Sequence, residues 1–290
     1  MPAFFPSGPP VWPGVASYQP FKIMTSTCQC YFETQHLQHN HPAMRELERD
    51  VLGCDFGGTS WTTKAQADAI PAALGLKPGV SLLEIGAGTG WPGLYLADRT
   101  GCDVTLLDIP LGSLKLAIDR ATKENVQGRC HPVAASGGAL PFTNGSFDAI
   151  GHSDVLCCLP DKLEMLQECR RVVNPGARML YYVIAPSAGL SAAGLQRACE
   201  VGPPFVETPA TYNELLSASG WVVTDRCDLT AEYRSALRRL ADGLEASSDI
   251  LQQVLGSQEL ADQVQHRRDQ IAAIEDGLLE REMVLVEAVQ

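Results

Sequence analysis

The stretch that decides the fold is Val-Ser-Leu-Leu-Glu-Ile-Gly-Ala-Gly-Thr-Gly-Trp-Pro-Gly, residues 80–93. Its first part, residues 80–85, is a short apolar run of the kind that forms a buried strand. Three glycines follow, Gly86, Gly88 and Gly90, and then an apolar helical stretch. Glycines allow positive φ and close backbone approach, and the first N–H groups of a helix attract polar or anionic groups. This order therefore predicts a nucleotide-binding corner.

The length of the chain suits one large α/β domain with additions, and its charge limits its partners. It has 290 residues, 45% of them hydrophobic, and a formal net charge of −12. A surface this acidic argues against binding nucleic acid or an anionic membrane. No apolar run approaches the roughly 20 residues of a membrane span, and the amino terminus lacks the pattern of a signal peptide. The ten cysteines have irregular spacings, so we expect reduced thiols in a cytoplasmic protein.

Strand and helix patterns alternate along the chain after the glycine-rich corner. Alternation with short connections predicts a parallel sheet with helices on both faces. The strands are predicted near residues 81–85, 103–107, 130–134, 147–152 and 178–184, and near 221–224. The helices between them are predicted near residues 91–99, 111–125, 161–173 and 211–218.

Further segments are expected to cap this core. Residues 1–42 show no regular apolar period, so they are expected to form a disordered arm. Residues 43–290 then form the domain, and a helix predicted over 62–76 should break or kink at Pro71. The domain divides into a core (78–228), cap elements (43–76 and 186–208), a helical insertion (230–279, in two stretches) and a last strand (281–287).

Cysteines and histidines cluster inside the predicted arm, at Cys28, Cys30, His36, His39 and His41. Thiols and imidazoles are ligands for zinc and copper. These spacings match no recognised structural zinc site, and no second half-site lies nearby. We therefore predict no metal site.

Two kinds of nucleotide fit the glycine-rich corner. Gly88, Gly90 and Gly93 satisfy the G-x-G-x-x-G pattern of dinucleotide-binding folds, but the pattern begins later after the strand than those folds prefer. Glu84 lies at the end of the strand, where a carboxylate in an apolar sheet needs a polar or cationic partner. Asp108 ends the second predicted strand, where a carboxylate can bind both hydroxyls of a ribose.

Taken together, these residues resemble the class I S-adenosylmethionine-dependent methyltransferases of the small-molecule type, over about residues 57–228. The family pattern Glu/Asp-x-Gly-x-Gly-x-Gly matches the run from Glu84 to Gly90, and the ribose-binding acid matches Asp108. The resemblance implies a Rossmann-like, doubly wound α/β sheet. This sheet would be mostly parallel with an antiparallel last strand, and helical cap or lid additions would cover it.

The resemblance also implies the cofactor S-adenosyl-L-methionine and its contacts. Glu84 would lie near the cationic amino-acid end, and Asp108 would make a two-point bond to the ribose. Ser136 stands where the family usually carries an acid toward the adenine. The full set of expected cofactor-binding residues is Glu84, Gly86, Ala87, Gly88, Gly90, Asp108, Ile109, Ser136, Gly137 and Ser153.

Methyl transfer is an in-line displacement, in which proximity and orientation supply most of the catalysis. His152 and Asp154 follow the fourth predicted strand and are candidate general bases for an acceptor that must lose a proton. Structural roles stay open for both, as a core histidine and as a loop or helix cap. Trp61 and Phe205 are expected to line the acceptor pocket.

The expected function is methyl transfer to a small molecule at oxygen, nitrogen or carbon. The family's Asn/Asp-Pro-Pro-aromatic motif, used for amide and nucleobase nitrogens, is absent after the fourth strand. We therefore expect no nucleic-acid partner, no membrane partner, and a monomer or homodimer. Two alternatives stay open: an NAD-dependent oxidoreductase, and a non-catalytic protein that binds S-adenosylmethionine.

Overall fold

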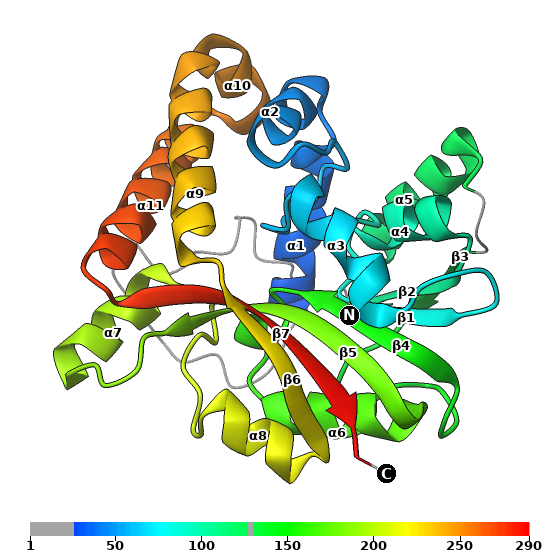
Figure 1. The fold of residues 1–290 in the computed structure, drawn as a ribbon. Helices are drawn as coiled ribbons and strands as arrows, with labels where there is room; N and C mark the ends of the chain where they lie inside the picture. The colour runs from blue at the N-terminus through cyan, green and yellow to red at the C-terminus, as the bar shows by residue number, and fades with distance from the viewer. Residues whose placement is uncertain (1–25, 127–129, 290) are drawn as a thin grey trace, which may run out of the picture.

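A single seven-stranded sheet forms the centre of the molecule (Figure 1). The structure, a computed structural model, describes residues 26–126 and 130–289, without the side chains of residues 26–30. The strands lie in the order β3-β2-β1-β4-β5-β7-β6. Their bounds are β1 (Ser81–Ile85), β2 (Asp103–Asp108), β3 (Cys130–Ala134), β4 (Phe147–Ser153), β5 (Val173–Pro186), β6 (Trp221–Asp228) and β7 (Leu279–Ala288).

The directions of the strands confirm the predicted fold class. Strands β1 to β5 pair in parallel, whereas β7 lies antiparallel between β5 and β6. Strand β1 is covered on both faces, which explains why its sequence is an almost continuous apolar run. The sheet is therefore mostly parallel, with an antiparallel last strand.

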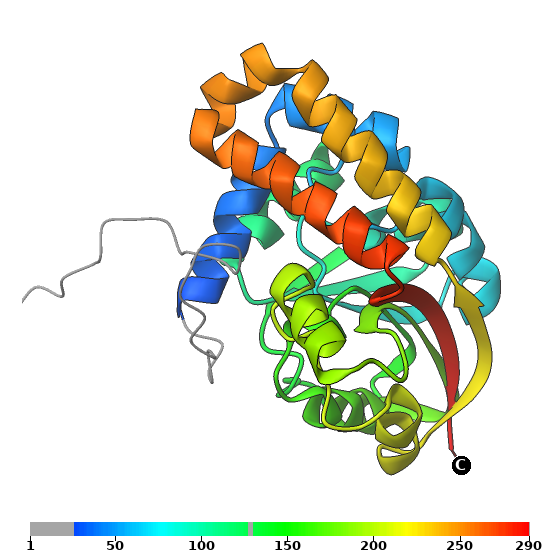
Figure 2. The ribbon, with the colours of Figure 1, turned by 90° about the vertical axis from the view of Figure 1, so that its left-hand side faces the viewer.

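Helices cover both faces of the sheet. In Figure 1, α6 and α8 lie below it, and α3, α4 and α5 lie above. Figure 2 shows α9 and α11 lying side by side over one end of the sheet. The bounds are α1 (Ser26–His39), α2 (Pro42–Leu52), α3 (Lys64–Leu74), α4 (Gly93–Thr100), α5 (Leu111–Glu124), η1 (Leu156–Cys158), α6 (Lys162–Val172), α7 (Ala192–Val201), α8 (Tyr212–Ala218), α9 (Thr230–Ala246), α10 (Ser248–Leu255) and α11 (Ser257–Glu275).

The predicted disordered arm is wrong for its second part, because residues 26–39 form helix α1. Contacts with α5 hold this helix: Glu33 Oε1 accepts from Gly112 N at 2.9 Å, and His36 Nδ1 lies 2.6 Å from Ser113 Oγ. The sequence of α1 has no amphipathic pattern, so tertiary contacts rather than periodicity stabilise it. Residues 1–25 lie outside the described residues.

Two predicted helix boundaries also differ. Helix α3 continues through Pro71 to Leu74, although a proline removes one helical hydrogen bond. The helix buries Ile70 and Leu74, and this packing favours the unbroken helix. The insertion predicted as two helical stretches consists of three helices, because a break at Ser247 separates α9 from α10.

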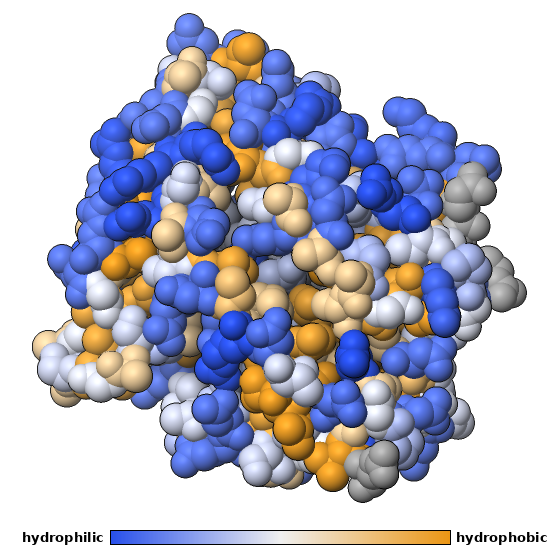
Figure 3. All heavy atoms as spheres, viewed as in Figure 1, coloured by the Kyte–Doolittle hydropathy of each residue, from blue (hydrophilic) through white to orange (hydrophobic). Residues whose placement is uncertain are grey.

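The surface shown in Figure 3 is mainly hydrophilic, as the acidic composition predicts, with an apolar strip in the region of β6 and β7. Val222 and Val289 are large hydrophobic residues that stay exposed. Among the helices within residues 26–126 and 130–289, none is long and apolar enough to cross a membrane.

Candidate active site

The order of the strands reverses direction between β1 and β4, and ligands of such sheets bind beyond the carboxyl ends of the strands at this point. The glycine loop follows β1, Asp108 ends β2, and Ser153 ends β4. The fold therefore brings the residues predicted to bind the cofactor to one edge of the sheet.

The glycine loop adopts backbone conformations that only glycine tolerates well. Gly86, Gly88 and Gly90 have φ values of 68°, 51° and 97°. A Cβ atom at residue 86 would also overlap Cγ2 of Val155. The N–H groups of Gly86 and Ala87 donate to the carbonyl of Leu107 at 2.8 and 3.1 Å, which fixes the loop to β2.

The carboxylate of Asp108 is held in place by backbone donors. Its Oδ2 accepts from Gly88 N at 2.6 Å, and its Oδ1 accepts from Ile109 N at 2.7 Å. Burial raises the pKa of Asp108, and these two hydrogen bonds oppose the rise. Each carboxylate oxygen has a second lone pair, so the group can still accept from two ribose hydroxyls.

Glu84 is buried directly beneath the glycine loop. Its carboxylate packs so closely against Gly93 that a Cβ there would overlap Oε2. That oxygen has no hydrogen-bond partner among the described residues, and burial raises the pKa of Glu84 to about 8. A backbone hydrogen bond from Gly93 partly opposes this rise of the pKa, but a buried carboxylate oxygen without a partner is costly unless a cation or donor reaches it. The residues present therefore fit the cationic amino-acid end of S-adenosylmethionine.

The residues predicted near the adenine follow β3. Ser136 is exposed, and its hydroxyl accepts from Gly138 N at 3.3 Å. Gly137 is buried, and a Cβ there would press against Ile85 and Met165. Ser136 thus has a free face toward solvent, and Gly137 lies against the end of β1.

Helix α1 covers the glycine loop. The His36 ring is buried, and a Cβ at Gly88 would lie 3.2 Å from it. His39 Nδ1 lies 2.9 Å from the carbonyl oxygen of Gly58. These histidines of the Cys-His cluster are therefore packing residues of the site, while the side chains of Cys28 and Cys30 lie outside the described residues.

His152 lies on β4 beneath the edge of the sheet that carries the site. Its ring is buried and stacks on the ring of Tyr181, with 5.0 Å between centroids. Neither ring nitrogen has a hydrogen-bond partner among the described residues, and burial lowers the pKa of His152 to about 3. The imidazole is therefore neutral at pH 7.

Asp154 is held in a buried ion pair with Arg281 of β7. Arg281 Nε and Nη2 donate to the two carboxylate oxygens, both at 3.0 Å, and the exposed fractions of the two side chains are 1% and 9%. Arg281 also donates to Thr62 Oγ1 at 3.3 Å, and Thr62 in turn donates to Ser153 Oγ at 3.0 Å. Both oxygens of Asp154 therefore face a permanent cation, an arrangement that orients neighbouring groups.

The two residues predicted to line the acceptor pocket lie around the loop after β4. Trp61 N donates to Asp154 Oδ2 at 3.4 Å. Phe205 N donates to the carbonyl of Cys157 at 3.0 Å, and the Phe205 carbonyl accepts from Lys162 Nζ at 2.6 Å. The fold thus places Trp61 and the backbone of Phe205 on two sides of one loop.

Sequence reasoning did not find Arg281, Lys162 or Glu33. Arg281 had a usable signal, because it is a charged residue in a strand with otherwise apolar inward positions. Lys162 is buried and donates to three backbone carbonyls, but an ordinary lysine at the start of a helix gives no such indication.

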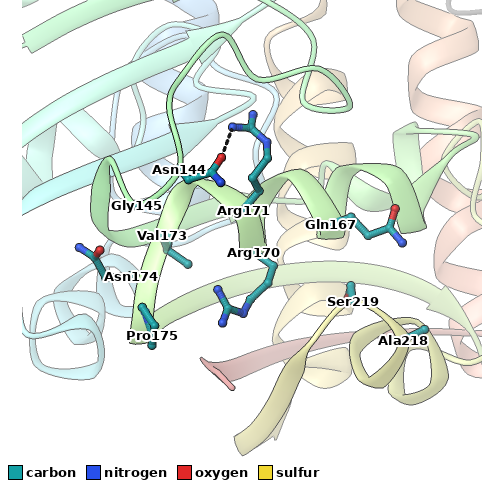
Figure 4. Close-up of a pocket in the computed structure, with 10 residues that line it drawn as sticks. All are labelled: Asn144, Gly145, Gln167, Arg170, Arg171, Val173, Asn174, Pro175, Ala218 and Ser219. Carbon is teal, nitrogen blue, oxygen red and sulfur yellow. Dashed lines mark hydrogen bonds between the residues drawn. The ribbon is translucent and has the colours of Figure 1, made fainter. Parts of the chain in front are cut away.

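A shallow hollow of about 550 Å³ lies elsewhere, at the amino ends of β4 and β5 (Figure 4). Asn144 and Arg171 lie on its rim and are joined by a hydrogen bond of 3.2 Å. Ligands of this class of sheet bind at the carboxyl ends of the strands, so the hollow lies away from the edge predicted to hold the cofactor.

Comparisons with known proteins decide the family. Residues 83–181 match a family model described as "Methyltransferase domain". The 27-O-demethylrifamycin SV methyltransferase of Amycolatopsis mediterranei is 31% identical over 187 residues, which cover 63% of this chain and 69% of that protein. The chain belongs to the class I S-adenosylmethionine-dependent methyltransferases. Its cofactor is S-adenosyl-L-methionine, and the dinucleotide alternative is set aside.

Other methyltransferases are similar to this protein, either in sequence over a shorter length or in fold. Methyltransferase GfsG of Streptomyces halstedii is 31% identical over 106 residues, 37% of this chain but only 38% of that protein. The phosphoethanolamine N-methyltransferase 2 of Haemonchus contortus, solved with S-adenosyl-L-methionine, has a TM-score of 0.72 at 17% identity. That match covers 96% of this chain and 61% of that one, and at this identity it shows the fold alone.

Proposed function

We propose that this methyltransferase transfers a methyl group to a small-molecule acceptor, mainly through proximity and orientation. The observation that carries the proposal is the convergence of the Asp108 carboxylate and the unpartnered Glu84 oxygen on one glycine loop. The similarity to the 27-O-demethylrifamycin SV methyltransferase, a relative named for a small-molecule acceptor, supports the acceptor class.

Each side chain at the cofactor end has one task in this proposal. Bound S-adenosylmethionine supplies a methyl group on a sulfonium, which is already an activated leaving group. Asp108 binds the ribose hydroxyls, because its oxygens are fixed by Gly88 and Ile109. Glu84 faces the ammonium group, which would lower its pKa and leave it ionised.

At the acceptor end we assign different roles to the two candidate bases. His152 is neutral at pH 7, so it can take a proton from an acceptor, although burial makes it a weak base. Asp154 is bound by Arg281 and orients Trp61 through its backbone N–H. Asp154 is thus a positioning residue in this account, and Trp61 and Phe205 border the acceptor.

The remaining proposals concern surroundings and assembly. We propose that the protein acts in the cytoplasm, as a monomer or homodimer, without nucleic-acid or membrane partners. The net charge of −12 supports the absence of nucleic-acid and anionic-membrane partners, because it opposes binding to polyanions.

Incubation with methyl-labelled S-adenosylmethionine and a cell extract tests the function. We expect label in the small-molecule fraction, and much less of it with Asp108→Asn. Label in the nucleic-acid or protein fraction would contradict the acceptor class. Binding of S-adenosylhomocysteine without transfer to any fraction would favour the non-catalytic alternative.

A further inference from the structure

Arg267, near the middle of α11, is a cation without a carboxylate partner among the described residues. Its guanidinium carbon lies 5.2 Å above the centre of the Trp61 ring. Its Nη1 donates to Gln270 Oε1 at 2.8 Å, whereas its Nε is buried and has no partner in the described part of the chain. Arg267 is half-buried, and arginines withdrawn from water are normally paired with carboxylates or other anions. In a chain with a net charge of −12, an unpaired one is unexpected.

A second unpartnered donor lies beside the same tryptophan. Tyr233 of α9 is 1% exposed, and its ring packs edge-on against Trp61 with 5.2 Å between centroids. Its hydroxyl has no hydrogen-bond partner among the described residues. A buried hydroxyl without a partner destabilises the folded state. Arg267 and Tyr233 both contact the Trp61 ring, so the two groups lie near each other.

The charges around this pair leave it electropositive. Asp154 is the acidic residue that acts on Tyr233, and Arg281 already neutralises it through two hydrogen bonds. His39 lies close enough for Arg267 to lower its pKa further than burial alone, so it is neutral at pH 7. No aspartate or glutamate in the described ranges forms an ion pair with Arg267.

The pair lies on the acceptor side of the site. Trp61, which both groups contact, donates its backbone N–H to Asp154 in the loop after β4. Ser153 precedes that loop and ends the strand at which the cofactor site lies. Trp61 therefore connects Arg267 and Tyr233 to the loop that follows β4.

We propose that Arg267 and Tyr233 bind an anionic group of the methyl acceptor, a carboxylate or a phosphate. Both unpartnered groups are donors, and an anionic oxygen only accepts. Charge-assisted bonds to an arginine fork are strong and directional, so they would fix the orientation of the acceptor. An acceptor with an ammonium group at this position would instead be repelled by the positive charge of Arg267. The assignment rests on the proposed function, because it names the acceptor of the same site.

This assignment is tested by titrating small probe molecules into the complex that the protein forms with S-adenosylhomocysteine. The probes are benzoate and phenyl phosphate, with benzamide as a neutral molecule of similar shape. The variants are Arg267→Met and Tyr233→Phe, with Arg267→Lys to keep the charge. Arg268→Met is the matched control, because Arg268 is the next residue of α11 and forms an exposed ion pair with Glu245.

We expect at least one anionic probe to bind about tenfold or more tightly than benzamide, as one charge-assisted bond implies. Arg267→Met should abolish this preference, Tyr233→Phe should weaken it, and Arg268→Met should leave it unchanged. Tighter binding of benzoate would indicate that the anionic group of the acceptor is a carboxylate, and tighter binding of phenyl phosphate would indicate a phosphate.

Three results would overturn the assignment: equal binding of benzamide, a preserved preference in a folded Arg267→Met, or no binding of any probe to the S-adenosylhomocysteine complex. Failure of the wild type to bind S-adenosylhomocysteine would instead refute the proposed function. Arg267→Lys should keep part of the preference, which separates loss of charge from loss of packing on Trp61.

Discussion

Two regions meet at one edge of the sheet: the proposed cofactor corner (the glycine loop, Glu84 and Asp108) and the proposed acceptor side (Trp61, Asp154 and Arg281). They hold their polar groups differently. At the cofactor corner, Asp108 is fixed by the backbone N–H groups of Gly88 and Ile109, which lie 20 residues and one residue away from it in sequence. On the acceptor side, Asp154 is fixed by the side chain of Arg281, 127 residues away. Almost every residue provides a backbone N–H donor, whereas the contact with Arg281 requires an arginine at that position and a fold that brings it to Asp154.

We expect the features that bind the cofactor to be shared by the family, and the side chains that contact the acceptor to vary between its members. A corner built from backbone and glycines accepts one cofactor and tolerates few changes. A surface built from distant side chains such as Trp61, Tyr233 and Arg267 can change without disturbing that corner. Four substitutions test this difference between the two regions.

Arg281→Met should have the largest effect. It leaves the carboxylate of Asp154 buried without its partner, which costs roughly 3–5 kcal/mol of unfolding free energy. Arg238→Met removes an exposed ion pair with Glu275 and should cost about 0–1 kcal/mol. Urea unfolding of both variants measures the difference, and equal losses would show that the buried pair does not organise the acceptor side.

Gly86→Ala should damage the cofactor corner. The new Cβ would overlap Val155 at a φ of 68°, so we expect a loss of about 2–4 kcal/mol and weaker binding of S-adenosylhomocysteine. Gly79→Ala is the control, because its φ is 86° but nothing lies within 4 Å. It should cost only about 1–2 kcal/mol and leave the affinity unchanged. Similar affinities in both variants would refute the close packing of the loop.

Glu84→Gln should change the pH dependence of stability. Burial raises the pKa of Glu84 from 4.5 to about 8, so between these values the native protein holds a proton that the unfolded chain releases. The contribution of Glu84 to stability is therefore full below pH 4.5 and is lost as pH rises to about 8. The stability of the wild type relative to Glu84→Gln should fall across this window. A difference that is independent of pH would contradict the assigned burial.

Thr63→Ala should have the smallest effect on stability and a specific one on activity. Thr63 caps α3 in a capping box with Gln66, and Thr211 does the same for α8 with Glu214. Loss of either cap should cost about 1 kcal/mol in thermal or urea unfolding. Gln66 Oε1 also accepts from Arg281, so Thr63→Ala alone should slow methyl transfer. Equal activity of Thr63→Ala and Thr211→Ala would show that the cap of α3 has no specific role in methyl transfer.

The sequence predicted the strand, glycine loop and helix of the cofactor corner because their determinants are local. A strand, three glycines and two acids at fixed spacing identify the corner, and alternating patterns predict the sheet around it. Helix α1 was missed because contacts of Glu33 and His36 with α5 stabilise it, not an amphipathic period. The partners of Asp154 and Trp61 could not be predicted, because they depend on how β7 and α11 fold back over the sheet.

Calorimetric titration with S-adenosylhomocysteine tests the central claim most directly, that this edge of the sheet holds the cofactor through Asp108. The wild type should bind one molecule, and Asp108→Asn should bind roughly 10- to 100-fold more weakly, as loss of a charge-assisted bond implies. Asp148→Asn is the matched control, because Asp148 accepts from Ser81 N at the opposite edge and should leave the affinity unchanged. No binding to the folded wild type, or equal binding by Asp108→Asn, would contradict this account.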